Sequence, residues 1–446
     1  MVKKRLSGWS AYPPQQLTDV LRPENTDEIV FCGEKIIPRG QGRSYGDAAM
    51  NSNYSVILSE RLNRFLSFDV EKGIIRLEAG VSFDELLSVI VPRGWFLPVT
   101  PGTKFVTLGG AISADVHGKN HHREGSFGDH VLEFNLRLAN QALVTCSRDQ
   151  NADLFHAAVG GFGLLGLIEE ASISLKKIET AFICQKTYAS RNFEETIGLL
   201  EANDHATYSV AWIDGLASEK ALGRGIVLLG EHAKEGDLPE ALKKVRLKLQ
   251  TLKERRIPKF FPFTLTRLKV KIFNALYYSI KKNQSDQTFN YFEDYFYPLD
   301  AVSGWNRIYG KRGFLQFQCV LPMKSYREGL SKIMGKISKS GNASFLTVLK
   351  RFGPESFGFL SFPFEGYTLA VDLPFDMAAL SLVRELNQIT CDYEGRLYFA
   401  KDACMLPEHF LKMYPKYASW KKIKDQYDPE CLFSSDLSRR LMEKVL

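Results

Sequence analysis

The segment from Pro38 to Asp47, PRGQGRSYGD, combines three glycines with two arginines directly after a short apolar run. Glycines at positions 40, 42 and 46 allow positive φ and close backbone approach, so successive N–H groups can surround the oxygens of a phosphate. Arg39 and Arg43 add positive charge. The segment is therefore a candidate phosphate loop, although a tight strand connection with solvated arginines would show the same pattern.

A second glycine cluster runs from Thr107 to His122 and reads TLGGAISADVHGKNHH. Its Gly-Gly pair opens an expected short helix and offers backbone donors and the positive end of a helix dipole to an anion. The histidines at positions 117, 121 and 122 raise the question of a zinc site. Their spacing lacks the separation of helical ligands, and no nearby cysteine or acidic pair completes a tetrahedron, so we expect no metal.

The third cluster, Gly160 to Gly166, contains the pattern G-x-G-x-x-G of dinucleotide-binding proteins. That fingerprint requires a strand before it and a helix after it. Here an expected helix, Ala152 to Ala158, precedes the glycines, and an expected strand, Gly166 to Leu175, follows them. The sequence context therefore argues against a nicotinamide site.

Five separated motifs resemble those of the vanillyl-alcohol-oxidase/PCMH flavoproteins, especially the members that oxidise a polyprenylphosphoryl ribose. In chain order they are RGQGRSYGD, PGTKFVTLGGAISADVHGKNHH, DLFHAAVGGFGLLGLI, LYFAKD and DPECLFSSDLSRRL. The resemblance runs from about Tyr12 to the C-terminus. It implies an α+β chain in which a PCMH-type FAD-binding domain of two α/β subdomains is followed by a substrate domain with an antiparallel sheet and flanking helices.

The resemblance also implies the domain limits and the site. It assigns residues 10–178 to the FAD-binding domain, 179–395 to the substrate domain, and 396–446 to a C-terminal segment that returns to the FAD domain. The implied cofactor-binding residues are Arg39, Gly40, Gln41, Gly42, Arg43, Ser44, Tyr45, Gly46, Asp47, Gly102, Thr107, Leu108, Gly109, Gly110, Ala114, Asp115, Val116, His117, Ile168 and Tyr398. The implied substrate-binding residues are Lys119, Gln316, Gln318 and Lys350.

Lys401 stands where the family places its substrate-binding, catalytic lysine. Flavin oxidation of a secondary alcohol transfers a hydride to the flavin and a proton to a base. A lysine can be that base if burial lowers its pKa, because desolvation disfavours the ammonium form. Beside Asp402, a surface lysine paired with the aspartate would be the ordinary interpretation. With the resemblance, we expect a pocket role, either as a base or as a clamp for an anion.

The implied reaction is FAD-dependent oxidation of the 2′-hydroxyl of a polyprenylphosphoryl-β-D-ribose to the 2′-keto sugar. This is the first half of an epimerisation to an arabinose donor for cell-wall biosynthesis, which a separate NAD(P)H-dependent short-chain reductase would complete. The alternative is an FAD-dependent oxidase of a soluble aldonolactone or alditol. Three substrate-side positions depart from the family: Ala370 replaces a cysteine of many members, Thr368 an asparagine and Phe296 a tyrosine.

Some relatives attach FAD covalently through a histidine, either in the first glycine loop or in a histidine-glycine segment. Arg43 stands where the first-loop histidine would be, and His117 begins the second type of segment. The members that this chain resembles most bind FAD without a bond. We therefore expect non-covalent FAD with His117 in contact.

Basic residues are concentrated between Lys243 and Lys282, where thirteen Lys and Arg stand against one acid, while the whole chain carries +7. No nucleic-acid-binding motif accompanies them, and the remainder of the chain is acidic, so we expect no nucleic acid. Within this stretch, six apolar residues fall on one helical stripe: Leu265, Leu268, Ile272, Phe273, Leu276 and Ile280. Phe260, Phe261 and Phe263 precede the stripe, and Lys269 falls within it. The pattern is typical of an interfacial membrane helix, and equally of a helix packed on the substrate domain.

The elements that must position these residues come from a chain of 446 residues that is 45% hydrophobic, enough for two cores. The seven cysteines form no C-x-x-C pair, which favours a reducing compartment over a disulfide scaffold. The N-terminus lacks the apolar segment of a secretory signal, and no run reaches the length of a membrane span. We therefore expect a cytoplasmic enzyme, or one held peripherally at the inner membrane.

Overall fold

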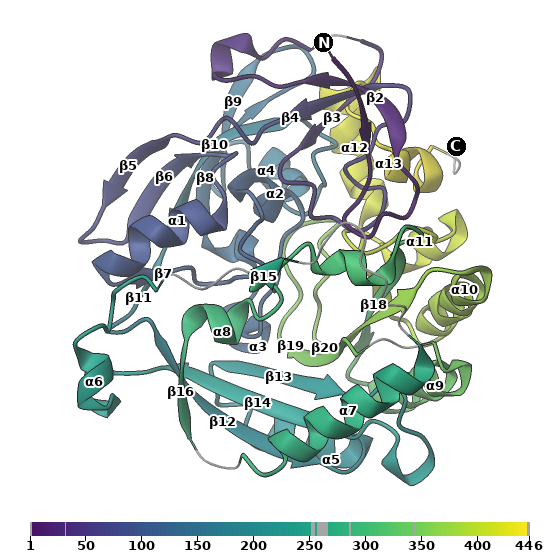
Figure 1. Cartoon of the computed structure of the whole chain (residues 1–446). Coiled ribbons are helices and arrows are strands. Elements are labelled where there is room, and N and C mark those ends of the chain that lie inside the picture. Colours follow the sequence, from purple (N-terminus) through teal and green to yellow (C-terminus); the bar gives the residue numbers. More distant parts are fainter. Residues whose placement is uncertain are drawn as a thin grey trace.

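The computed structural model describes residues 2–31, 33–250, 255–256, 266–284, 287–342 and 345–443, with the backbone alone at 255–256. The chain forms three main sheets (Figure 1). The predicted α+β class is confirmed, and so is the antiparallel sheet expected after the FAD-binding region. The domain limits at residues 178 and 395 stay predictions.

The first sheet has the order β1-β2-β4-β3, in which β2, β4 and β3 run parallel. Strand β4 reads SVIL and is buried throughout, as expected for a parallel strand covered on both faces. The first glycine loop leaves the carboxyl end of β3. The strands are β1 (Val2–Leu6), β2 (Gln16–Leu21), β3 (Ile36–Arg39) and β4 (Ser55–Leu58).

The second sheet is antiparallel, with the order β5-β6-β10-β8-β9. Helix α1 begins with a capping box, in which Ser82 and Glu85 bond each other's backbone N–H groups, and it turns its apolar side to the core. The strands are β5 (Phe65–Asp69), β6 (Ile74–Glu78), β8 (Val131–Arg137), β9 (Leu143–Ser147) and β10 (Leu167–Ser174), and the short pair is β7 (Trp95–Phe96) with β11 (Lys176–Lys177). The helices are α1 (Phe83–Ile90), α2 (Leu108–Ser113), α3 (His121–Glu124) and α4 (Ala152–Ala158).

The third sheet is fully antiparallel and has eight strands in the order β16-β12-β14-β13-β19-β20-β18-β21. Its strands are β12 (Phe182–Ser190), β13 (Tyr208–Ile213), β14 (Gly225–His232), β16 (Thr288–Tyr291), β18 (Phe314–Pro322), β19 (Thr347–Phe352), β20 (Gly366–Pro374) and β21 (Arg396–Leu397), and the pair β15 (Arg255–Arg256) and β17 (Val302–Ser303) lies apart. Its helices are α5 (Phe193–Ala202), α6 (Glu240–Lys243), α7 (Arg267–Lys281), α8 (Phe292–Phe296), α9 (Tyr326–Ser340) and α10 (Met377–Asp392).

Beyond β21 the chain crosses back to the first sheet, where the C-terminal helices lie beside the N-terminal strands (Figure 1). Trp420 donates from Nε1 to the carbonyl of Ala157 (3.0 Å), and Phe433 forms a bridge with Ile36 of β3. The helices are α11 (Pro407–Met413), α12 (Tyr417–Tyr427) and α13 (Asp436–Leu441). The segment therefore joins the eight-stranded sheet to the glycine loop.

Candidate functional site

A cavity of about 780 Å³ reaches from the first glycine loop, across the inner ends of α2 and β10, to one face of the eight-stranded sheet. The predicted site residues that line it are Arg39, Gly40, Gln41, Gly42, Arg43, Ser44, Tyr45, Gly102, Thr107, Gly109, Gly110, Ala114, Val116, His117, Lys119, Ile168, Gln316, Gln318, Lys350, Tyr398 and Lys401. Segments that are far apart in the sequence thus meet around one space of ligand size.

The first glycine loop presents its backbone to the cavity. Gly42 has a φ of +64°, a left-handed conformation, and a Cβ there would lie 2.2 Å from Nη2 of Arg39. In the described part of the chain, the N–H groups of Gly40, Gln41, Gly42 and Arg43 have no hydrogen-bond acceptor. Four unpaired donors on one turn are suited to the oxygens of a phosphate group.

The two arginines of this loop support its shape more than they add charge to it. Arg39 donates from Nη2 to the carbonyl of Ser7 (2.7 Å) and from Nη1 to that of Ala49 (2.9 Å). Burial lowers the pKa of Arg39 to about 10. Arg43 donates from Nε to the carbonyl of Phe105 (3.1 Å). The loop therefore offers a ligand mainly its backbone donors.

The second glycine cluster packs directly on the first. A Cβ on Gly40 would lie 2.2 Å from Oγ1 of Thr107, the residue that caps α2 by accepting from Gly110 N–H. A Cβ on Gly109 would lie 2.9 Å from Cβ of Ala79, so α2 also approaches the second sheet closely. The third cluster also reaches the cavity, where Gly163 and Gly166 line it. Helix α4 precedes it and β10 follows it, as the sequence indicated.

The three histidines serve different contacts. Nε2 of His117 accepts from Nε2 of Gln318 (3.0 Å), Nδ1 of His121 accepts from the N–H of Gly353 (3.1 Å), and Nε2 of His122 lies 2.9 Å from the carbonyl of Ala206. Burial lowers the pKa of all three, which are neutral near pH 7. Within the described residues, no group of three or more His, Cys, Asp or Glu side chains is arranged to hold a metal ion.

His117 keeps one ring nitrogen available to a ligand. Since its Nε2 accepts a hydrogen bond, the proton belongs on Nδ1, which is buried and has no partner among the described residues. His117 lines the cavity beside Tyr398, whose hydroxyl donates to the carbonyl of Ala114 (3.0 Å). An unpaired buried donor at the cavity wall is suited to an acceptor atom of a bound ring system.

Three lysines, Lys119, Lys350 and Lys401, line the cavity. Nζ of Lys401 lies 3.4 Å from the ring centroid of Tyr45, and the N–H of Tyr45 donates to the carbonyl of Ala400 (2.7 Å). Lys119 donates to the carbonyl of Tyr295 and lies over the Tyr295 ring. Lys350 comes from β19. The first glycine loop is thus fastened to the segment that carries Lys401.

The surrounding protein desolvates these ammonium groups and lowers their pKa values. Desolvation lowers the pKa of Lys119 to about 7 and that of Lys350 to about 8. It also lowers the pKa of Lys401 to about 7, while Asp372 opposes this shift and Lys350 adds to it. Desolvation disfavours the charged form, so a neutral amine is accessible to Lys401 near pH 7.

The register of the eight-stranded sheet brings the predicted glutamines to the lysines. In the β18–β20 pair, Gln316 lies opposite Asp372 and Gln318 opposite Ala370. Gln316 donates to the carboxylate of Asp372, which also accepts from the hydroxyl of Tyr309 (3.2 Å). Burial raises the pKa of Asp372. The two glutamines share one face of β18 because strand residues two apart do so.

Four predicted cofactor residues do not reach the cavity. Leu108 and Asp115 are fully buried, and Oδ1 of Asp115 accepts from the N–H of Gly128 (2.9 Å). Gly46 packs so closely that a Cβ would lie 1.7 Å from the carbonyl oxygen of Asp402. Asp47 forms an ion pair with Arg440. These residues shape or fasten the glycine segments instead of lining the space between them.

Several residues of the site were not found from the sequence. Asp372 holds Gln316 and is itself bonded by Tyr309, although neither lines the cavity. The outer part of the cavity is lined by Val210, Trp212, Leu228 and Tyr277, together with the polar Gln185 and Asn290. The acid within the apolar run TLAVDLP was the one available signal for Asp372. The aromatic and aliphatic residues carry no comparable signal, because their types are those of any core.

The predicted basic stretch is described only in part. Residues 257–265, with Phe260, Phe261, Phe263 and Leu265, lie outside the described residues. The region from 267 to 281 forms helix α7, as the stripe indicated. No helix in the described ranges is both long and apolar enough to cross a bilayer.

Comparisons with known proteins agree with this geometry. Residues 20–147 match the model of the FAD binding domain, and residues 320–441 match that of D-arabinono-1,4-lactone oxidase. The chain is 38% identical to decaprenylphosphoryl-beta-D-ribose oxidase of Mycolicibacterium smegmatis over 98% of this chain and 97% of the relative. It is 22% identical to L-gulono-1,4-lactone dehydrogenase of Mycobacterium tuberculosis over 97% of this chain and 99% of that one.

The FAD binding model covers the first glycine loop and α2, the segments whose unpaired backbone donors and close glycine contacts fit a dinucleotide. The lactone oxidase model covers β20 and the segment that carries Lys401. The full-length relative spans both. The chain therefore belongs to the family of FAD-dependent oxidases that act on sugar hydroxyl groups and include decaprenylphosphoryl-beta-D-ribose oxidase.

Proposed function

We propose that this enzyme oxidises the 2′-hydroxyl of a polyprenylphosphoryl-β-D-ribose to the 2′-ketone with non-covalently bound FAD. The observation that carries the proposal is the change in the chemistry of the lining groups along the cavity. Free backbone donors lie on the first glycine loop, three lysines line the cavity between this loop and the sheet, and Val210, Trp212 and Leu228 of β13 and β14 add apolar surface beside the polar Gln185 and Asn290. The backbone donors suit the pyrophosphate of a nucleotide, the lysines suit an anionic sugar, and the apolar residues suit a prenyl chain.

The first two glycine segments would hold the cofactor. The unpaired N–H groups of residues 40–43 suit its pyrophosphate, and the free Nδ1 of His117 suits an acceptor of its ring system. Bound FAD supplies the hydride acceptor for oxidation of a secondary alcohol. His117 makes this contact without a bond in our proposal, and Arg43 is occupied with Phe105.

Lys401 accepts the proton of the 2′-hydroxyl in this proposal. Its amine is partly neutral near pH 7 and lies on the Tyr45 ring, which limits its movement. Lys119 and Lys350 pair with the phosphate of the substrate, and Gln316 and Gln318 bond its sugar hydroxyls. Gln316 is kept in orientation by Asp372, so the sugar meets preorganised donors.

The apolar wall distinguishes a lipid-linked substrate from a soluble one. Trp212, Leu228 and Tyr277 continue the cavity beyond the lysines, where a small lactone would leave apolar surface uncovered. A prenyl chain would bury it, at about 25 cal/mol per Å² of apolar area. The ketone product then requires a separate reductase of the NAD(P)H-dependent short-chain type to complete an epimerisation.

The test is anaerobic reduction of the holoenzyme. A short-chain prenylphosphoryl ribose should bleach the flavin absorbance in a single turnover, while an aldonolactone or an alditol should leave it unchanged. The match to D-arabinono-1,4-lactone oxidase makes the soluble substrate the second candidate. Bleaching by the lactone, with none by the prenylphosphoryl ribose, would establish that candidate instead.

A further inference from the structure

Helix α7 exposes the stripe that an ordinary surface helix would bury. Leu268 is 67% exposed, Ile272 59% and Leu276 58%, and Phe273 and Ile280 are also exposed. An amphipathic helix on a globular protein usually turns its apolar stripe to the core. The outward stripe of α7 therefore needs a different surface to cover it.

The opposite face of α7 is held to the eight-stranded sheet by specific contacts. Asn274 is fully buried and donates from Nδ2 to Oδ1 of Asp214 (2.7 Å), and the Tyr277 ring packs on Trp212 at 4.7 Å between centroids. The hydroxyl of Tyr278 donates to the carbonyl of Ser190 (3.2 Å). Rotating the helix to bury its stripe would break these contacts, so the outward orientation is built in.

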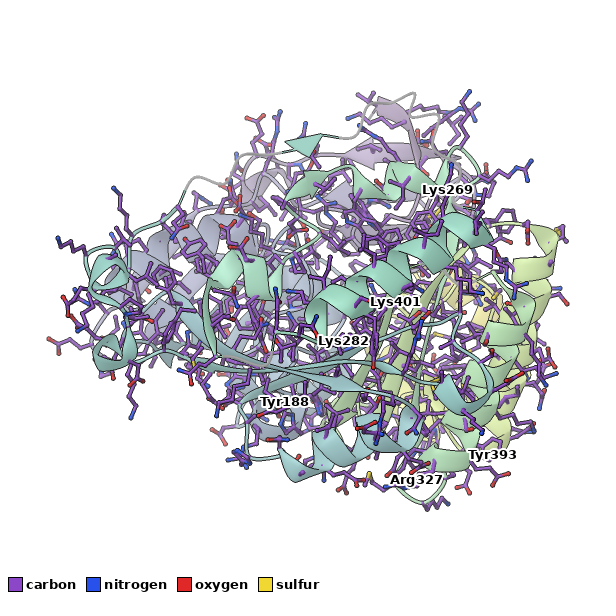
Figure 2. All side chains as sticks on the ribbon, turned by 60° about the horizontal axis from the view of Figure 1, so that its bottom comes forward. Tyr188, Lys269, Lys282, Arg327, Tyr393 and Lys401 are labelled. Atoms are coloured by element: carbon purple, nitrogen blue, oxygen red, sulfur yellow. The ribbon has the colours of Figure 1, made fainter. Side chains whose placement is uncertain are left out.

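Positive charge accompanies the exposed stripe. Lys269, Lys271 and Lys282 are exposed, and residues 266–284 contain no acidic residue. At 100° per residue, Lys269 falls within the stripe, and Lys271 and Lys282 fall along one flank of it. Figure 2 shows Lys269 and Lys282 near opposite ends of the helix. Long lysine side chains can lay their methylenes along an apolar surface while the ammonium group reaches an anionic layer.

The cavity opens at the C-terminal end of the same helix. Tyr277, Lys281 and Gln284 line it there, together with Thr288 of β16. Gln284 and Thr288 are exposed, so this end of the cavity reaches the surface. Helix α7 thus lines the mouth of the cavity with its inner face and carries the exposed apolar stripe on its outer face.

We propose that α7 docks the enzyme on an anionic lipid bilayer, with the stripe at the boundary of headgroups and acyl chains and the cavity mouth against that surface. An apolar stripe beside lysines is the composition of an interfacial helix. The docking proposal is based on α7 alone and does not depend on the identity of the substrate. The further step, entry of a lipid-linked sugar phosphate from the bilayer into the cavity, rests on the proposed function.

A second copy of the chain is a poorer match for this surface. A two-fold interface would place the same patch on itself and bring Lys271 and Lys282 of one copy near their equivalents. Facing like charges disfavour such contact, whereas anionic headgroups neutralise them. The charge of the patch therefore favours lipid.

The experiment is flotation of the FAD-loaded enzyme with vesicles of phosphatidylcholine alone or with phosphatidylglycerol. The parent should bind the anionic vesicles and be released by salt, because the attraction is screened over roughly a Debye length of about 10 Å. Lys271→Gln/Lys282→Gln should weaken binding about 10- to 30-fold. Ile272→Gln/Leu276→Gln should weaken it at least tenfold, roughly as expected for two lost apolar contacts. Lys281 is left intact because it lines the cavity.

Matched control variants carry the same types of substitution at exposed positions outside α7. Lys412→Gln/Lys422→Gln removes two exposed lysines from the C-terminal helices, and Met377→Gln/Leu411→Gln removes two exposed apolar residues elsewhere. Both controls should bind vesicles as the parent does. All variants should reduce flavin at the parental rate with a water-soluble short-chain substrate.

Two results would overturn docking: equal flotation of the parent and both α7 variants at low salt, or a parental dimer in solution that Ile272→Gln/Leu276→Gln dissociates. Flotation contains no substrate, so its outcome is independent of the proposed reaction. If the parent floats and no prenylphosphoryl ribose reduces the flavin, docking stands and the proposed substrate fails. If the reverse holds, the substrate stands and docking fails.

Discussion

The two ends of the cavity are built in different ways. The cofactor end uses backbone from two glycine segments, and its donors are the N–H groups of residues 40–43. The substrate end uses side chains from β18, β19 and the segment after β21, such as Gln316, Lys350 and Lys401. Backbone recognition depends on glycine geometry and tolerates little change. Side chains, by contrast, can be exchanged singly without a change in the backbone.

The largest effect should follow a change at the backbone end. Gly42→Val would force a β-branched residue into a positive φ and place its Cβ against Arg39, so the turn must open and FAD should be lost completely. The flavin absorbance of the purified protein measures this. Gly310→Val is the matched control, because Gly310 has a φ of +73° but nothing within 4 Å of its Cβ position. Retention of FAD in Gly42→Val would contradict the assigned loop.

At the substrate end, Lys401→Ala should keep FAD and the fold but slow flavin reduction about 10²- to 10⁴-fold, the usual cost of removing a general base. Stopped-flow reduction at saturating substrate is the measurement. Lys350→Ala serves for comparison and should act mainly on substrate affinity, because its lysine is placed for the phosphate. An unchanged reduction rate in Lys401→Ala would move the base to Lys119 or Lys350.

A smaller effect, of about tenfold or less within the accessible range, should appear in the pH profile. As a base, Lys401 must be neutral, so flavin reduction should slow as pH falls below about 7 and level off above it. Asp372 raises the pKa of Lys401, so Asp372→Asn should move the profile to lower pH. Saturating substrate separates this titration from that of Lys119 and Lys350 in binding. A rate that falls as pH rises through the same range would show a cationic clamp instead.

The mildest test leaves the chain unchanged. Acid precipitation should release all flavin into the supernatant, because in our proposal His117 contacts the cofactor without a covalent bond. Absorbance of the supernatant and the pellet gives the distribution. A yellow pellet would indicate a covalent bond, and His117→Ala would then have to abolish it.

The same contrast explains what could be predicted from the sequence. The glycine segments and Lys401 lie in continuous motifs, so their residues were found together. Asp372 reaches Gln316 across 56 positions through strand register, which no short pattern reports. Leu108 and Asp115 belong to the second glycine motif, yet Leu108 of α2 and Asp115 just beyond that helix are buried away from the cavity. A motif indicates which segment approaches a ligand, while helix and strand geometry decide which of its side chains do.

Helix α7 shows the same limit of sequence-based prediction for the orientation of a whole helix. The spacing of Leu268, Ile272 and Leu276 predicts an amphipathic helix, and the structure has one. The period alone does not say which face points inward. The side chain that decides this is Asn274, whose buried partner Asp214 lies 60 positions earlier in the chain. Asparagine opposite an apolar stripe is common on solvated helices, so its presence does not predict that this face is buried.

Arg440 has a consequence for the order in which the enzyme can be completed. Its guanidinium bonds Asp47 (2.8 Å), 393 positions earlier, and Asp402 (2.8 Å), so one side chain fastens the glycine loop to the segment of Lys401. On a ribosome, the loop emerges long before its fastening. The glycine loop therefore gains this fastening only once residue 440 has been made, 393 positions after Asp47.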